Sequence, residues 1–200
     1  MDPNKKPTNV IKTFESQFQM MRKANNENDI NKHSKVKIEN INFLQKKIKS
    51  SFVDLIVTSP PYVTSYEYAD LHQLSTLWLG FVDDYKYLRE GTIGSLYHNS
   101  NLNNDIKQLN KTGEEIVFKL YNQDKRKAKS AAKYFVDMQK SIEKAYKMLN
   151  CNGIALFVIG NTEYKSVKIN NAKHLVECMH DTGFKEIEIT KRKISGKILT

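Results

Sequence analysis

Two short apolar segments, each bordered by turn residues, most constrain the fold of this chain. Residues 51–57 read Ser-Phe-Val-Asp-Leu-Ile-Val and lead into Pro60 and Pro61. Residues 154–159 read Ile-Ala-Leu-Phe-Val-Ile and follow the pair Asn152-Gly153. Apolar runs of this length are typical of strands that are buried on both faces. Two prolines end a strand, since proline has no N–H to donate. We therefore predict two buried strands.

Helical patterns surround these strands. Apolar residues recur at the spacing of one helix face in residues 8–23, 68–81, 134–149 and 172–179. Gly183 stops the last of these helices, and residues 184–191 then alternate as a third strand would, with Ile187 and Ile189 facing inward. The order strand, helix, strand, helix, strand predicts an α/β fold with a largely parallel sheet.

The remaining segments carry weaker signals. We predict an N-terminal helical extension over residues 1–34 and one domain over residues 35–200. Residues 36–43 hint at a short strand, and the asparagine-rich residues 97–113 are predicted to form a loop. Four histidines have no partner at ligand spacing and are expected at the surface: His33, His98, His174 and His180.

Composition limits the classes of protein. The net charge of +10 favours polyanionic partners such as nucleic acid. An AT-rich genome, which raises Lys, Asn and Ile everywhere, explains the charge equally well. No apolar run approaches the roughly 18–20 residues of a membrane span, and no secretory signal begins the chain. Cys151 and Cys178 cannot build a four-ligand zinc site. We expect a cytoplasmic chain without a membrane span or a metal.

The end of the first predicted strand carries the chemistry. In open α/β sheets, ligands bind beyond the carboxyl ends of the strands. Residues 54–62, Asp-Leu-Ile-Val-Thr-Ser-Pro-Pro-Tyr, place a hydroxyl, two prolines and an aromatic ring there. This segment resembles the catalytic motif of the DNA amino-methyltransferases, which modify the exocyclic nitrogen of cytosine or adenine. Residues 66–70, 77–80 and 134–161 are also similar to that family. The resemblance covers about Val36 to Ile194, with Thr-Ser-Pro-Pro-Tyr as its diagnostic core.

The resemblance implies a partial class I (Rossmann-like) methyltransferase fold, S-adenosylmethionine as cofactor, double-stranded DNA as substrate and a restriction–modification system. The residue types suit this reaction. A base amine is a poor nucleophile because its lone pair is conjugated into the ring, and the base must be flipped out to be reached. Ser59 and the Pro60 carbonyl are the expected acceptors for the amine. Pro60 and Pro61 fix the backbone, and Tyr62 offers a stacking face worth roughly 1–3 kcal/mol.

The first residue of the motif indicates the target base. In the family, Ser-Pro-Pro-Tyr tends to accompany methylation of cytosine N4, whereas Asp- or Asn-Pro-Pro-Tyr tends to accompany adenine N6. Ser59 therefore favours cytosine N4, with adenine N6 as the alternative. Methylation of RNA or of a protein glutamine is less expected, since those families more often carry Asn or Asp at this position.

Further residues are assigned to the site by their position near the motif. Thr58 and Asn161 are expected at the cofactor, although Gly160-Asn161 is also an ordinary turn. Three residues are expected at the flipped base or the DNA backbone: Tyr66, Tyr68 and His72. Ordinary helix packing explains Tyr68 and His72 about equally well. Residues 91–122 are the candidate target-recognition insert, because they are long and polar.

One family feature is absent. The family carries a Phe-x-Gly-x-Gly turn at the cofactor, yet no two of the eight glycines here are separated by a single residue. The missing half is expected downstream in a permuted parent chain, upstream, or on a second polypeptide. We therefore predict that this chain alone binds S-adenosylmethionine weakly or not at all. A non-catalytic, DNA-binding fragment is the alternative from another class.

Overall fold

The computed structural model describes residues 9–27, 35–63, 68–89, 92–93 and 101–192, which fall into two units, Met1–Asn40 and Ile41–Thr200. The first unit contains helix α1 (Val10–Glu27), in which no residue is buried. The side chain of Asn9 accepts a hydrogen bond from the Lys12 N–H at 3.0 Å, so it caps the helix. The predicted helix at 8–23 is therefore confirmed as an element.

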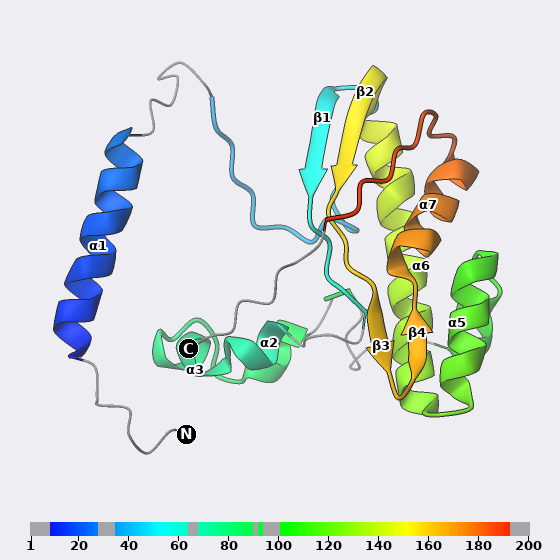
Figure 1. Cartoon of the computed structure of the whole chain (residues 1–200), viewed down its shortest axis with the longest axis horizontal. Coiled ribbons are helices and arrows are strands. Elements are labelled where there is room, and N and C mark those ends of the chain that lie inside the picture. Colours follow the sequence, from blue (N-terminus) through cyan, green and yellow to red (C-terminus); the bar gives the residue numbers. More distant parts are fainter. Residues whose placement is uncertain (1–8, 28–34, 64–67, 90–91, 94–100, 193–200) are drawn as a thin grey trace. The chain divides into compact units, whose positions relative to one another are not determined.

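The second unit contains a two-stranded parallel sheet, which confirms the α/β class with a small parallel sheet (Figure 1). Strand β1 (Val53–Thr58) pairs with β2 (Leu149–Phe157), and Thr58 lies opposite Phe157. The remaining elements of this unit are α2 (Tyr68–Leu71), α3 (Gln73–Trp78), the 3-10 helix η1 (Tyr85–Arg89), α4 (Leu102–Ile106), α5 (Lys111–Tyr121), α6 (Lys125–Met148), β3 (Thr162–Tyr164), β4 (Val167–Ile169) and α7 (Asn171–Thr182).

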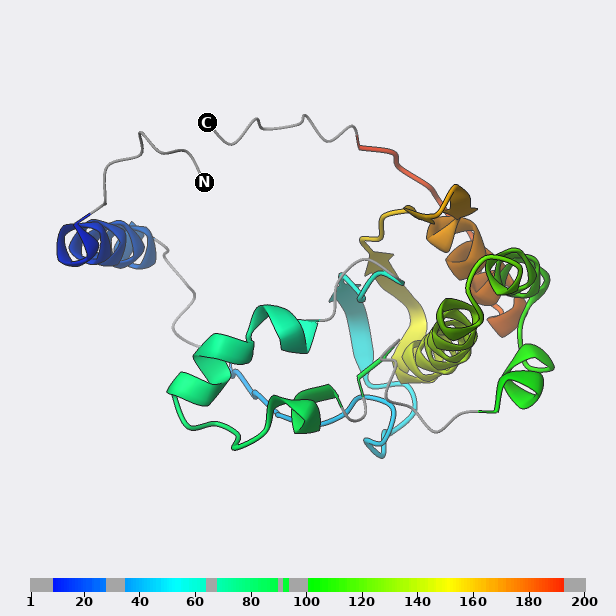
Figure 2. The same cartoon turned by 90° about the horizontal axis from the view of Figure 1, so that it is seen from below.

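The core lies on one side of the β1–β2 sheet. Helices α6 and α7 both lie on this side, and α5 packs against α6 (Figures 1 and 2). Small buried residues of α6, among them Ala128, Ala131 and Ala132, let the neighbouring helices approach closely. Phe157 and Ile159 pack onto this core from the sheet.

The opposite face of the sheet is uncovered. Its apolar side chains are each 53–65% exposed: Leu55, Val57, Ile154, Leu156 and Val158. The prediction that both strands are buried on both faces is therefore wrong for the described residues. The reason is that α6 and α7, which supply much of the core beside the sheet, both lie on one side of it (Figures 1 and 2). The apolar pattern of the two strands is typical of a sheet that is covered on both faces, but the described residues cover only one face.

The loop predicted over residues 97–113 is wrong for residues 101–113, because asparagines there cap two helices. Asn101 caps α4 by accepting the N–H groups of Asn103 and Asn104, and Asn110 caps α5 by accepting that of Gly113. These residues therefore start helices. Helix α5 is also part of the core, since Val117 and Leu120 are fully buried.

The predicted third strand at 184–191 is also wrong. The described residues beyond Gly183 form no strand; Ile187 packs against the core, but Ile189 is 62% exposed. Residues 36–43 likewise form no strand, and the helix predicted at 68–81 is divided into α2 and α3.

The β3–β4 hairpin was not expected from sequence. Its two-residue turn, Lys165-Ser166, has positive φ angles of 45° and 66°, as a type I′ turn requires.

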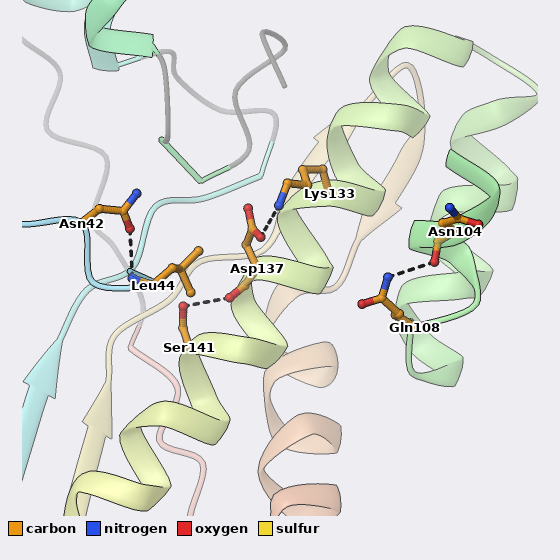
Figure 3. Close-up of polar contacts among 7 residues, drawn as sticks. All are labelled: Asn42, Leu44, Asn104, Gln108, Lys133, Asp137 and Ser141. Carbon is orange, nitrogen blue, oxygen red and sulfur yellow. Dashed lines mark hydrogen bonds and ion pairs between the residues drawn. The ribbon is translucent and has the colours of Figure 1, made fainter. Parts of the chain in front are cut away.

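Helix α6 begins nine residues earlier than the predicted Tyr134, at Lys125. Asp124 caps it by accepting the N–H groups of Arg126 and Lys127. The Tyr164 hydroxyl donates to the same carboxylate at 2.7 Å, and this bond lowers the pKa of Asp124. Further along α6, buried Asp137 pairs with Lys133, and its carbonyl accepts the Ser141 hydroxyl (Figure 3). The same view shows two local bonds elsewhere: the Leu44 N–H donates to Asn42 Oδ1, and Gln108 Nε2 donates to the Asn104 carbonyl.

His174 on α7 is buried, so its expected place at the surface is wrong. Its ring stacks on Phe135 at a centroid distance of 4.3 Å, and its neighbour Cys178 is also buried. Burial lowers the pKa of His174 from 6.5 to about 4, although the charge of Glu177 acts in the opposite direction. The ring is therefore neutral at pH 7.

Among the described residues, no helix is long and apolar enough to span a membrane.

His174 makes stability depend on pH. Between pH 6.5 and about 4 the unfolded chain protonates His174 and the folded chain does not. The free energy of unfolding should therefore fall as the pH drops through this window, by at most about 3 kcal/mol. Urea unfolding at pH 7.0, 5.5 and 4.5 measures the fall. His174→Gln should flatten it, and His180→Gln, at an exposed position of the same helix, should not. Equal pH dependence in all three proteins would contradict this.

Candidate functional site

The Thr-Ser-Pro-Pro-Tyr motif forms the turn directly beyond the carboxyl end of β1. Thr58 is the last residue of the strand, and its carbonyl accepts the Val158 N–H at 2.9 Å. Ser59 is exposed at the turn, whereas Pro60 is buried. We call residues 59–63 the motif loop. Its position beyond a parallel strand is where ligands bind in α/β sheets.

Three side-chain hydroxyls hold the motif loop in place. Ser59 Oγ donates to the Val158 carbonyl at 3.1 Å, which ties the loop to the segment after β2. Tyr134 Oη, from α6, donates to the Pro61 carbonyl at 2.7 Å. Thr162 Oγ1, from β3, donates to the Val63 carbonyl at 3.0 Å. The loop is therefore fixed by segments that lie about 70 to 100 residues away in the sequence.

The loop presents acceptors and few donors. Pro60 and Pro61 have no backbone N–H. The proton of the Ser59 hydroxyl is engaged by Val158, so the lone pairs of the oxygen remain as acceptors. Among the described residues, none donates a hydrogen bond to the Pro60 carbonyl, although the carbonyls of Pro61 and Val63 are both bonded. The Ser59 hydroxyl oxygen and the Pro60 carbonyl are therefore two acceptors on consecutive residues of the loop, of which Ser59 is exposed and Pro60 is buried.

Tyr62 is half-buried and lies against Gly160, which follows β2. A Cβ atom at Gly160 would lie 3.3 Å from Cε2 of the Tyr62 ring. The glycine therefore makes room for the ring. Gly160 is itself held by buried Asn171, whose Nδ2 donates to the Gly160 carbonyl at 2.9 Å.

The two residues predicted at the cofactor lie beyond the same ends of the strands as the motif loop. Thr58 is half-buried at the end of β1. Asn161 is exposed, and its Oδ1 accepts the Ala172 N–H at 3.0 Å near the start of α7. Its amide nitrogen bonds no described residue, and an N–H₂ donor of this kind suits the carboxylate of an amino acid. Asn161 and Thr162 also border an open hollow of about 360 Å³.

The structure describes two of the three residues that are predicted to contact DNA, His72 and Tyr68. His72 is exposed at the start of α3, and its carbonyl accepts the Thr76 hydroxyl at 2.8 Å. Tyr68 begins α2, and Tyr66 lies outside the described residues. Among the described residues, no group of three or more His, Cys, Asp or Glu side chains is placed to hold a metal ion.

Sequence reasoning missed the residues that support the loop. Tyr134 occupies an apolar position in the helical period and gives no sign of its hydroxyl's partner. The one signal is general, since a buried tyrosine needs a hydrogen-bond partner. Thr162 and Asn171 have no comparable signal, because their partners are set by the hairpin and by the start of α7.

Comparison with known proteins gives one informative match. The chain is 28% identical over 149 residues to the type II methyltransferase M.MvaI of Kocuria varians. The match covers 70% of this chain and 32% of the relative, so the chain spans about a third of that protein's length. No family model matches the chain, and no solved structure matches it significantly. The similarity supports a relationship to the DNA methyltransferases.

Proposed function

We propose that this chain carries the catalytic motif of a DNA methyltransferase that acts on the exocyclic N4 of cytosine. The observation that carries the proposal is the orientation of Ser59. Its hydroxyl proton is directed to the Val158 carbonyl at 3.1 Å, which leaves the oxygen as an acceptor next to the Pro60 carbonyl, to which no described residue donates. The similarity to a type II methyltransferase supports the same reaction class.

The acceptor pair acts on the amine of a flipped base. The two N–H groups donate to Ser59 Oγ and to the Pro60 carbonyl, which favours a pyramidal nitrogen with a localised lone pair. The same acceptors stabilise the positive charge that develops on the nitrogen during methyl transfer. Because the loop is held by three hydrogen bonds before the base arrives, little reorganisation is needed. Tyr62 supplies the stacking surface.

S-adenosylmethionine, when bound, supplies the methyl group. Thr58 and Asn161 are the residues of this chain that we propose at its methionine part, because an exposed amide suits a carboxylate. They form only part of a cofactor site, since the glycine-rich turn is absent from the sequence and the hollow beside Asn161 is open. We propose that other sequence, on a longer parent chain or a second polypeptide, provides the rest.

Two alternatives to methylation of cytosine N4 are each supported by a specific observation. Methylation of adenine N6 uses the same acceptor pair and differs only in the base. A non-catalytic, DNA-binding fragment is favoured by the missing glycine-rich turn and by the uncovered face of the sheet. We also propose a restriction–modification role, because the relative is named a type II methyltransferase. Residues 91–122 remain a proposed recognition segment, with its DNA contacts restricted to side chains outside the core.

Product identification tests the proposal. Because we propose that other sequence completes the cofactor site, the full protein or complex that contains this chain is incubated with unmethylated genomic DNA and S-adenosylmethionine, and the nucleosides are analysed by mass spectrometry. We expect N4-methylcytosine, reduced by about 100-fold in Ser59→Ala because one transition-state acceptor is lost. Ser141→Ala, whose hydroxyl bonds within α6, should retain the activity. N6-methyladenine would overturn the base assignment, and no methylated base would favour the DNA-binding fragment.

Gly160→Ala tests the placement of Tyr62. The added methyl group would meet the ring at 3.3 Å, so the ring must shift by a few tenths of an ångström. We expect methyl transfer to fall by roughly tenfold, because small misplacements are costly in an oriented site. In a Tyr62→Ala background, Gly160→Ala should have no further effect on the rate, since its target is gone. Additive losses would show that Gly160 acts independently of Tyr62.

A further inference from the structure

We infer that Tyr134 is the positioning residue that determines which carbonyl of the motif loop is available to the base amine. This inference rests on the proposed function. Tyr134 comes from α6, is 1% exposed, and donates its hydroxyl proton to the Pro61 carbonyl at 2.7 Å. It does not belong to the Thr-Ser-Pro-Pro-Tyr motif, from which it is separated by more than 70 residues of sequence.

The ring of Tyr134 is held firmly within the core. It packs edge-on against Phe135 with ring centroids 5.4 Å apart, and Phe135 stacks in turn on His174 at 4.3 Å. The same stretch of α6 carries the ion pair of Lys133 with Asp137 (Figure 3). A side chain packed in this way can move little, so its hydroxyl defines a fixed point for the loop.

The hydrogen bond separates the roles of two neighbouring carbonyls. Neither Pro60 nor Pro61 has an N–H, so the loop cannot fix itself through its own backbone at these positions. The hydroxyl of Tyr134 occupies the Pro61 carbonyl, which cannot then compete strongly for the amine. The Pro60 carbonyl, next to Ser59 in the chain, receives no hydrogen bond from a described residue. Thr162 anchors the far end of the loop at Val63.

The test is Tyr134→Phe, which removes only the hydroxyl, with Tyr146→Phe as the matched control. Tyr146 lies on the same helix but is 43% exposed and packs against Phe184. The contact is measured by NMR on protein labelled with ¹³C at proline carbonyls and ¹⁵N at tyrosine. Pro61-Tyr62 is the one Pro-Tyr pair in the chain, so the spectrum contains a single correlated signal. We expect this signal to move in Tyr134→Phe and to stay in place in Tyr146→Phe.

Methyl transfer is measured with the same substitutions in the full protein or complex that completes the cofactor site. With the wild-type rate as reference, we expect kcat of Tyr134→Phe to fall by up to about 100-fold, with KM for DNA changed much less. The melting midpoint separates this effect from loss of folded protein. An unmoved Pro61-Tyr62 signal would overturn the inference, and so would a moved signal with an unchanged kcat. If the wild-type full protein or complex transfers no methyl group, the proposed function fails, while the signal still decides whether Tyr134 fixes the loop.

Discussion

The consecutive prolines after β1 create the constraint on which the site depends. A segment without backbone N–H groups at Pro60 and Pro61 cannot close on itself through these positions, so its shape depends on side-chain hydroxyl donors. The donors are the hydroxyls of Ser59, Tyr134 and Thr162. The same lack of N–H groups makes the loop rich in acceptors, which is what an incoming amine requires. The two prolines therefore account both for the way the motif loop is held and for its hydrogen-bond acceptors.

Helix α6 connects the motif loop to the core of the fold. It begins at the Asp124 cap, runs through the buried alanines against its neighbours, and leads directly into β2. Tyr134 in its middle supports the motif loop, and the segment that follows β2 supplies the Val158 carbonyl and Gly160. The core is thus built around the element that orients the site. The opposite face of the sheet is left apolar and uncovered, as expected of part of a larger sheet.

The sequence predicts the periodic elements well and the contacts between them poorly. The strands at β1 and β2 and the helices α6 and α7 follow from apolar periodicity, which is a local property. The asparagines at 101 and 110 mislead, because the same residue that favours a loop also caps a helix. His174 misleads because burial against Phe135 cannot be seen from ligand spacing. The motif identifies Ser59 through Tyr62, but Tyr134 becomes part of the site only through packing.

A crystal structure of the full protein or complex that contains this chain, with a cytosine-containing duplex and S-adenosylhomocysteine, tests the central claim most directly. The account predicts a flipped cytosine whose N4 lies about 3 Å from both Ser59 Oγ and the Pro60 carbonyl. Tyr134 should still donate to the Pro61 carbonyl, and the Ser59 proton should still be directed to Val158. An amine that contacts neither acceptor, or a motif loop that has left the Tyr134 hydroxyl, would contradict the account.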